Sequence, residues 1–282
     1  MIHLHKEDFD VALMCDALEV SRQGYYDSID RPVCDRDLKR QTLDAAIRLA
    51  HIESQCRYGS PNIHAELSEK GIECCVNHVA LRMQALGIRS VVNKKFRVST
   101  TDSNHDLPVH ENALDRDFVA TLPNQKWVAD ITYIHTDEGF VYLAGVVDLF
   151  SRKIVGWCMK DSLHSDLCVE ALELALAQRK PGKGLLHHSD RGSQYAGGQY
   201  QNKLGEFDLT CSMSRVGNCW DNAVMERVWA SLKTELVYQR HFKTKQEAID
   251  AIFEWIEVWY NRKRRHSSLN YLSPETYESQ LN

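Results

Sequence analysis

Two different spacings of apolar residues divide this chain near residue 124. Before that point apolar residues recur every three or four positions, as Val79, Met83 and Leu86 do, which is the period of an amphipathic helix. After it, runs of β-branched and aromatic residues such as "QKWVADITYIH" are typical of strands. The pattern predicts an all-helical region followed by a region that contains a sheet.

The helical region divides further at its turn signals. Residues 1–37 begin with a short helical pattern, and the stretch "RQGYYDSIDRP", with its glycine and proline, is typical of a turn. Residues 38–92 contain three helical segments, of which the last two are short and closely connected. This arrangement fits a helix-turn-helix whose final helix, 77–86, could enter a DNA major groove, and it fits a plain three-helix bundle equally well.

The sheet region, residues 124–240, begins with three β-rich runs separated by short turns and continues as alternating helix and strand. This order predicts an α/β fold with a mixed five-stranded sheet flanked by helices, which is the ribonuclease-H-like arrangement.

Two aspartates occupy special positions in that sheet. Asp130 interrupts the apolar first strand, and Asp190 ends the fourth strand, "GLLHHSD". Taken singly, Asp130 could be a paired buried acid and Asp190 a turn or helix-cap residue. If the two strands are neighbours, the carboxylates meet, and two buried acids together call for a metal ion.

A third acid follows on the last helix of the sheet region. Glu226 lies 36 positions after Asp190 (226 − 190), and Lys233 lies two helical turns further on. The same helix face therefore presents an acid and a base to one groove.

Basic residues gather in two segments outside the sheet. The linker 93–123 and the tail 241–282 could both contact phosphates, or both could be solvated surface charge. Because the net charge of the chain is −5, any binding to nucleic acid must be local. The candidate DNA contacts in these segments are Lys94, Lys95, Arg97, Arg262, Lys263, Arg264 and Arg265.

Length and composition indicate a globular protein of about two folded units. The 282 residues are 43% hydrophobic, yet no run approaches the ~20 apolar residues of a membrane span. The nine cysteines include no C-x-x-C pair, and we expect them to be reduced thiols. We expect a cytoplasmic protein.

Several longer motifs together resemble a known family. The chain is similar to the second-reading-frame product of insertion-sequence transposases of the IS-three type, within the retroviral-integrase-like superfamily that carries an Asp-Asp-Glu triad. The motifs are "YGSPNIHAEL", "PNQKWVADITYI", "YLAGVVDLFSRKIVGW", "HHSDRGSQY", "GNCWDNAVMER", "SLKTEL" and "YNRKRRHSSLNYLSPETYE".

The resemblance implies a catalytic and metal-binding triad of Asp130, Asp190 and Glu226, with Lys233 on DNA. It implies two Mg²⁺ or Mn²⁺ ions per site, with Asp130 bridging both, and a reaction of DNA end cleavage followed by strand transfer. Implied partners are double-stranded DNA at the element ends and the target, further copies of the chain on that DNA, and the product of an upstream reading frame, as a partner or a fusion. In a bacterium such a protein would associate with the nucleoid.

Two other functions fit part of this pattern. A regulator derived from a transposase would bind DNA through the helical region without catalysis, although three intact acids speak against it. A stand-alone ribonuclease-H-type nuclease would use the metals without joining strands.

Overall fold

A computed structural model describes residues 1–30, 34–91, 108–215 and 219–281. The chain forms two compact units, Met1–Arg89 and Ser90–Asn282. The finer division into segments 1–37, 38–92, 93–123, 124–240 and 241–282 stays a prediction. Among the described helices, none is both long and apolar enough to cross a lipid bilayer.

The first residues form short helices: η1 (Ile2–Leu4), α1 (Val11–Ala17) and α2 (Arg22–Asp30). Asp10 caps α1 by accepting a hydrogen bond from the Ala12 N–H at 2.8 Å. The turn predicted over "RQGYYDSIDRP" is wrong for its first nine residues, which are helical. Ser21 explains the difference, because its hydroxyl accepts from the Gly24 N–H and starts a helix that the glycine does not stop.

Three helices complete the first unit, as predicted: α3 (Asp35–Glu53), α4 (Ser60–Glu69) and α5 (Val76–Ala85). Arg82 ties α5 to α3 through two hydrogen bonds to the Asp44 carboxylate, of 2.8 and 2.7 Å. The buried apolar side chains come from all three helices and are Leu43, Ile47, Ala50, Ile63, Leu67, Val79 and Met83.

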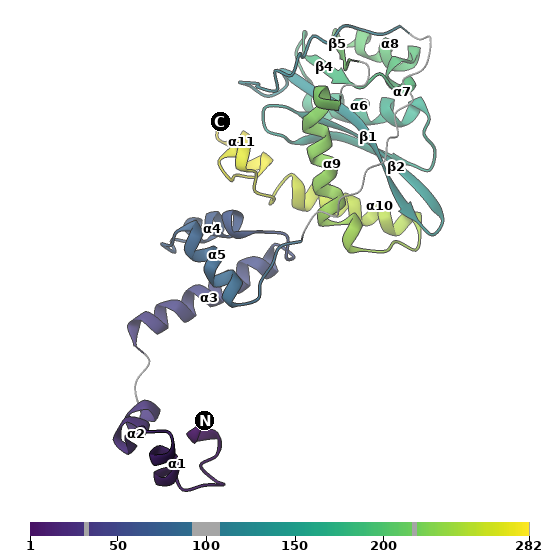
Figure 1. Cartoon of the computed structure of the whole chain (residues 1–282). Coiled ribbons are helices and arrows are strands. Elements are labelled where there is room, and N and C mark those ends of the chain that lie inside the picture. The colour runs from purple at the N-terminus through teal and green to yellow at the C-terminus, as the bar shows by residue number, and fades with distance from the viewer. Residues whose placement is uncertain (31–33, 92–107, 216–218, 282) are drawn as a thin grey trace. The chain divides into compact units, whose positions relative to one another are not determined.

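The second unit is built on the predicted mixed five-stranded sheet, whose order is β3-β2-β1-β4-β5 (Figure 1). The first three strands form an antiparallel meander, and β4 and β5 then run parallel to β1. The strands are β1 (Lys126–Thr136), β2 (Gly139–Asp148), β3 (Ile154–Lys160), β4 (Leu186–Ser189) and β5 (Thr210–Met213).

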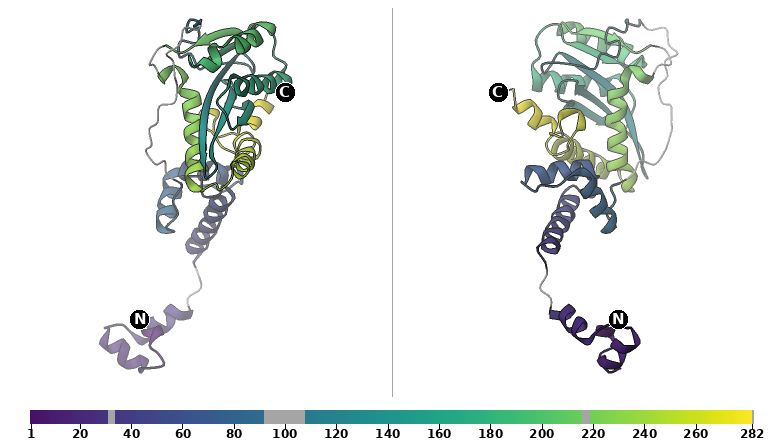
Figure 2. Two further views of the ribbon diagram at one scale, coloured as in Figure 1. Left: turned by 90° about the vertical axis from the view of Figure 1, so that its right-hand side faces the viewer. Right: turned by 60° about the vertical axis from the view of Figure 1, so that its left-hand side comes forward.

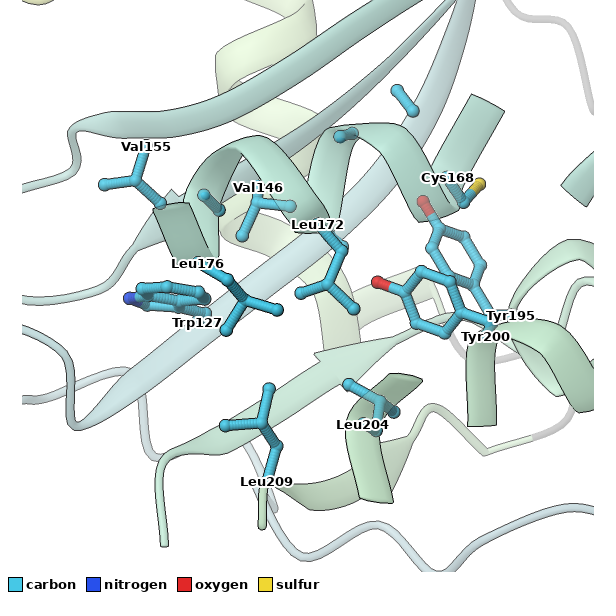
Figure 3. Packing of buried hydrophobic residues seen from close by; sticks show 14 of the residues in the cluster. Trp127, Val146, Val155, Cys168, Leu172, Leu176, Tyr195, Tyr200, Leu204 and Leu209 are labelled. Carbon is cyan, nitrogen blue, oxygen red and sulfur yellow. The ribbon is translucent and has the colours of Figure 1, made fainter. Parts of the chain in front are cut away.

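Helices cover both faces of this sheet (Figure 2). One face packs against α6 (Ser165–Arg179), α7 (Ser193–Ala196) and α8 (Gly198–Glu206). Their core includes Trp127 from β1 and the rings of Tyr195 and Tyr200, which meet edge to face (Figure 3). The opposite face is covered by α9 (Ala223–Glu235), followed by η3 (Val237–Gln239), and by α10 (Lys245–Phe253).

Gly156 lets α6 approach β3 closely, so we expect Gly156→Ala to destabilise the second unit. An added Cβ would lie 2.3 Å from the Ala171 carbonyl oxygen and 2.6 Å from the Ala175 nitrogen, and backbone atoms of a helix cannot move aside singly. The expected loss of unfolding free energy is about 1–3 kcal/mol in urea denaturation. Gly198→Ala is the matched control, because nothing lies within 4 Å of its added Cβ. Equal stability of the two variants would contradict this packing.

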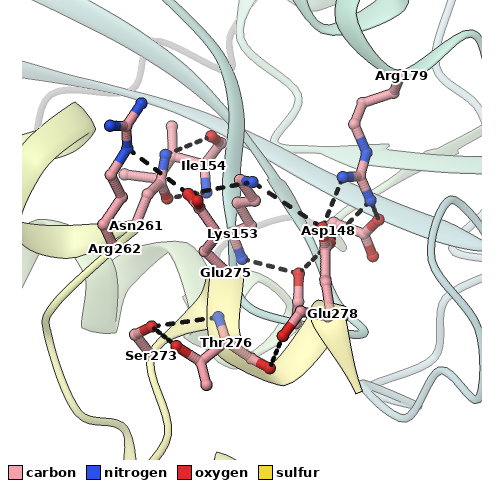
Figure 4. Close-up of polar contacts among 12 residues, drawn as sticks. Asp148, Lys153, Ile154, Arg179, Asn261, Arg262, Ser273, Glu275, Thr276 and Glu278 are labelled. Atoms are coloured by element: carbon pink, nitrogen blue, oxygen red, sulfur yellow. Dashed lines mark hydrogen bonds and ion pairs between the residues drawn. The ribbon is translucent and has the colours of Figure 1, made fainter. Parts of the chain in front are cut away.

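The C-terminal tail packs against the same unit. After α10 the chain continues through the π-helix η4 (Glu254–Tyr260), the short η5 (Ser267–Leu269) and α11 (Pro274–Ser279). The Asn261 amide both donates to and accepts from the backbone of Ile154 at the edge strand β3, at 3.0 Å each. Arg179 pairs with Glu278 and Asp148 (Figure 4). These contacts join segments about a hundred residues apart into one body.

Candidate active site

The register of two parallel strands brings Asp130 and Asp190 to the same level of the sheet. Residues of β1 and β4 pair with a constant offset of sixty, from Lys126 with Leu186 to Val128 with His188. The same offset carries Asp130 to Asp190, two positions beyond the last pair. The pairing of β1 with β4 confirms that the strands of Asp130 and Asp190 are neighbours. Asp130 lies on the face covered by α9, because Gly145, its partner on β2, packs against Trp229.

A tight turn holds Asp190 where β4 ends. Its carboxylate accepts a hydrogen bond from the Gly192 N–H at 2.9 Å, and a Cβ at Gly192 would lie only 3.0 Å from that oxygen. His188 anchors the strand just before the turn by hydrogen bonds to the hydroxyls of Ser212 and Ser214. Burial lowers the pKa of His188 to about 4, so this anchor is neutral.

The helix that carries Glu226 is clamped at its start. The Asp221 carboxylate in η2 (Cys219–Asn222) is completely buried and accepts hydrogen bonds at 2.9 Å from Asn112, Arg116 and the Arg215 N–H. Glu226 follows in the first turn of α9, where the helix dipole favours an acid. The neighbouring loop residue Gly217 lies outside the described residues.

Asn222 links this helix directly to the strand of Asp130. Its amide donates to the Ala129 carbonyl at 3.1 Å, one residue before Asp130. Asn222 stands at the N-cap position of α9, but its side chain bonds to β1 and does not cap the helix. This hydrogen bond holds the start of α9 next to the middle of β1.

The electrostatics of the acids show that they influence one another. The pKa of Asp130 is raised well above its usual range, first by burial, then by the charge of Asp190 and, more weakly, by that of Glu226. The protein around Glu226 covers part of this exposed residue and raises the pKa of its carboxyl by desolvation. Within the described ranges, no three His, Cys, Asp or Glu side chains yet lie close enough together to hold one ion. The two aspartates are neighbours, and Glu226 lies close enough for its charge to raise the pKa of Asp130.

Lys233 lies two turns along α9 from Glu226. Its ammonium stands over the ring of Tyr133 on β1, 5.1 Å from the centroid. Burial lowers the pKa of Lys233, and the negative charge of Asp130 opposes that shift. Lys233 is thus held near Asp130, as the helix spacing predicts.

The four basic residues at positions 262–265 of the tail lie in different environments, some hydrogen-bonded within the fold and some exposed. The Arg264 guanidinium donates to the Glu235 carboxylate at 2.8 Å, and that carboxylate also accepts from the indoles of Trp255 and Trp259. Arg265 donates to the Tyr271 carbonyl. Arg262 and Lys263 are exposed, as phosphate contacts need to be, whereas the linker candidates Lys94, Lys95 and Arg97 lie outside the described residues.

The sequence-based prediction did not identify two residues that shape this site. Trp229 lies between Glu226 and Lys233 on α9, buried against the sheet, and Asp221 holds the start of the same helix. The sequence signal for Asp221 was a polar pair directly before an amphipathic helix, and that signal equally suits an ordinary cap. For Trp229 no local signal existed, because a buried tryptophan usually serves packing.

Comparison with protein families matches the architecture. The integrase core domain matches residues 120–219 in one model and 208–274 in another, and the HTH-like domain matches residues 38–96. The latter match favours the helix-turn-helix interpretation of α3 to α5 over the plain bundle.

Similar proteins extend over nearly the whole chain. The insertion element IS600 uncharacterized 31 kDa protein of Shigella sonnei is 43% identical over 94% of this chain and 97% of its own length. The transposase InsF for insertion sequence IS3A of Escherichia coli (strain K12) is 40% identical over 99% of this chain and 97% of its own. A chain in the structure of the simian T-cell lymphotropic virus intasome with PP2A regulatory subunit B56 gamma is 17% identical, covering 83% of this chain and 74% of that one with a TM-score of 0.48. The chain therefore belongs to the family of IS3 insertion-sequence transposases, with an integrase core preceded by a helix-turn-helix-like domain.

Proposed function

We propose that this protein cleaves DNA at the ends of an insertion sequence and joins those ends to a target, with Asp130, Asp190 and Glu226 as its catalytic acids. The observation that carries the proposal is the register that brings Asp130 and Asp190 to the same level of neighbouring strands, with Glu226 on α9 near enough for its charge to affect Asp130. A scissile phosphodiester can approach such a set of acids from one direction.

The three acids suit hard divalent cations. Carboxylate oxygens are the ligands that Mg²⁺ and Mn²⁺ prefer, and a cation would relieve the burial and mutual repulsion that raise the pKa of Asp130. When bound, two such ions activate an attacking oxygen and stabilise a leaving one. Asp130 and Asp190 would hold the ions where β4 ends beside the middle of β1, and Glu226 would turn inward from the clamped end of α9.

Lys233 would hold the DNA backbone next to the acids. An ammonium is a compact cation suited to a phosphate, and burial near Tyr133 limits its freedom. Lys233 would position the phosphate and carry no metal.

The exposed part of the tail would add phosphate contacts, and salt dependence tests them. If Arg262 and Lys263 each contact one phosphate of double-stranded DNA, replacing both with alanine should flatten the slope of log affinity against log salt by about 1.8. Fluorescence anisotropy between low and moderate salt measures the slope. Lys183→Ala is the control, because it removes an exposed lysine from a loop of the core. A slope unchanged in the double variant would mean that these residues are only solvated charge.

An assay on DNA carrying the element ends separates the proposal from its alternatives. With Mg²⁺ or Mn²⁺, with and without the product of the upstream reading frame, we expect cleavage followed by joining to a second duplex. Cleavage without joining would indicate a nuclease, and binding without either reaction would indicate a regulator. Separating the same protein–DNA mixtures by size would show whether several copies of the chain assemble on the DNA. In a bacterium we propose that this assembly takes place on the nucleoid, where the element ends occur.

A further inference from the structure

The indole N–H of Trp229 is a buried donor without a hydrogen-bond acceptor among the described residues. The side chain is only 5% exposed, so water does not readily replace the missing partner. A buried donor without an acceptor destabilises the fold, so its persistence calls for an explanation.

The ring lies over the strand pair that contains Asp130. Gly145 on β2 is the residue directly opposite Asp130 on β1, and opposite residues of an antiparallel pair share one face of the sheet. A Cβ at Gly145 would lie 2.7 Å from Cη2 and 3.1 Å from Cζ2 of Trp229. The missing side chain at Gly145 therefore makes the space that the indole occupies, next to Asp130.

The indole N–H of Trp229 interacts with the Asp130 carboxylate without meeting the full geometry of a hydrogen bond. This interaction lowers the pKa of Asp130, whereas burial and the charges of Asp190 and Glu226 raise it.

We propose that Trp229 is a positioning residue, whose indole N–H donates to one oxygen of Asp130 when that carboxylate holds a metal ion. This inference rests on the proposed function of Asp130. A donor behind a ligating carboxylate fixes its orientation and leaves the remaining lone pairs toward the ion. Because Trp229 lies on the same helix as Glu226, the contact would also couple the placement of the two acids.

Replacing the N–H by sulfur tests the proposal with little change of shape. We expect the full chain with 3-benzothienylalanine at position 229 to bind Mn²⁺ about tenfold more weakly, measured from the electron paramagnetic resonance signal of free Mn²⁺. Its thermal unfolding should match that of the parent. The control is the same replacement at Trp157, whose N–H donates to Glu257 at 2.8 Å, and it should leave Mn²⁺ affinity unchanged.

A second measurement follows the indole N–H of Trp229 by nuclear magnetic resonance in the parent protein, with its six tryptophans labelled with ¹⁵N. The variant Trp229→Phe serves only to identify the resonance, because it removes that signal. This resonance should move downfield when Mg²⁺ is added to the parent, and it should stay in place in Asp130→Asn. Parent-like Mn²⁺ affinity without the indole N–H, or a stationary resonance, would overturn the positioning role alone. Absence of any Asp130-dependent Mn²⁺ binding by the parent would overturn the proposed metal site as well.

Discussion

Glu226→Gln should reduce the rates of strand cleavage and joining more than about 100-fold. Removing a residue that only hydrogen-bonds to a metal ligand typically lowers metal affinity or activity about 10- to 100-fold, and removing a ligand should cost more. Glutamine keeps the size of glutamate and removes the charge that would hold a cation. Because Glu226 is largely exposed at the clamped start of α9, the substitution should leave the fold intact. The measurement is Mg²⁺-dependent joining of element-end DNA.

DNA affinity of the same variant should stay within a few fold of the parent, because the proposed phosphate contacts lie at Lys233 and in the tail. Glu254→Gln is a suitable control, since it removes one exposed carboxylate from η4 and leaves the acids of the site in place. If Glu226→Gln joined strands as fast as an active parent, the three-carboxylate mechanism would be wrong.

Arg264→Ala should destabilise the second unit by roughly 3 kcal/mol, the scale for breaking a buried ion pair by removing one partner. The side chains of Arg264 and Glu235 are only 19% and 9% exposed. Without the guanidinium, the Glu235 carboxylate keeps a buried charge and only the indoles of Trp255 and Trp259 to stabilise it. Urea denaturation measures the loss.

Arg262→Ala provides the comparison, because its side chain is 62% exposed and pairs loosely with Glu275 at 3.6 Å. Its removal should change the unfolding free energy by less than about 0.5 kcal/mol. A stable Arg264→Ala protein that has lost DNA affinity would show instead that Arg264 contacts phosphate, as its place in the basic run suggests.

The start of α9 connects the fold to the proposed chemistry. Asp221 ties η2 to Asn112 and Arg116 in the segment before the sheet, and Asn222 ties it to the strand of Asp130. The helix then presents Glu226, Trp229 and Lys233 in succession. One element thus carries the third acid, its candidate positioning residue and the candidate phosphate contact.

Local pattern sufficed for the sheet, whereas the triad of acids came from the family resemblance and stays a prediction. Strand alternation and helix periodicity depend on neighbours within a few residues, so β1 to β5 and α6 could be predicted closely. The family motifs around Asp130, Asp190 and Glu226 named the acids, and the sequence implied that two of them meet only if their strands were neighbours, which the sheet order shows. The helix α2 was missed because the hydroxyl of Ser21 outweighs the glycine that signalled a turn.

The tertiary structure decided the roles that depend on distant partners. The sequence indicates that Arg264 is one of four equivalent cations. In the structure its side chain is partly buried, because it donates to the carboxylate of Glu235, which lies 29 positions earlier. In the sequence Trp229 indicates only packing, and it is the pairing of Gly145 with Asp130 that places its ring over the strand pair of an acid. Whether a charge or a donor is buried depends on what folds against it, and that surface comes from residues far along the chain.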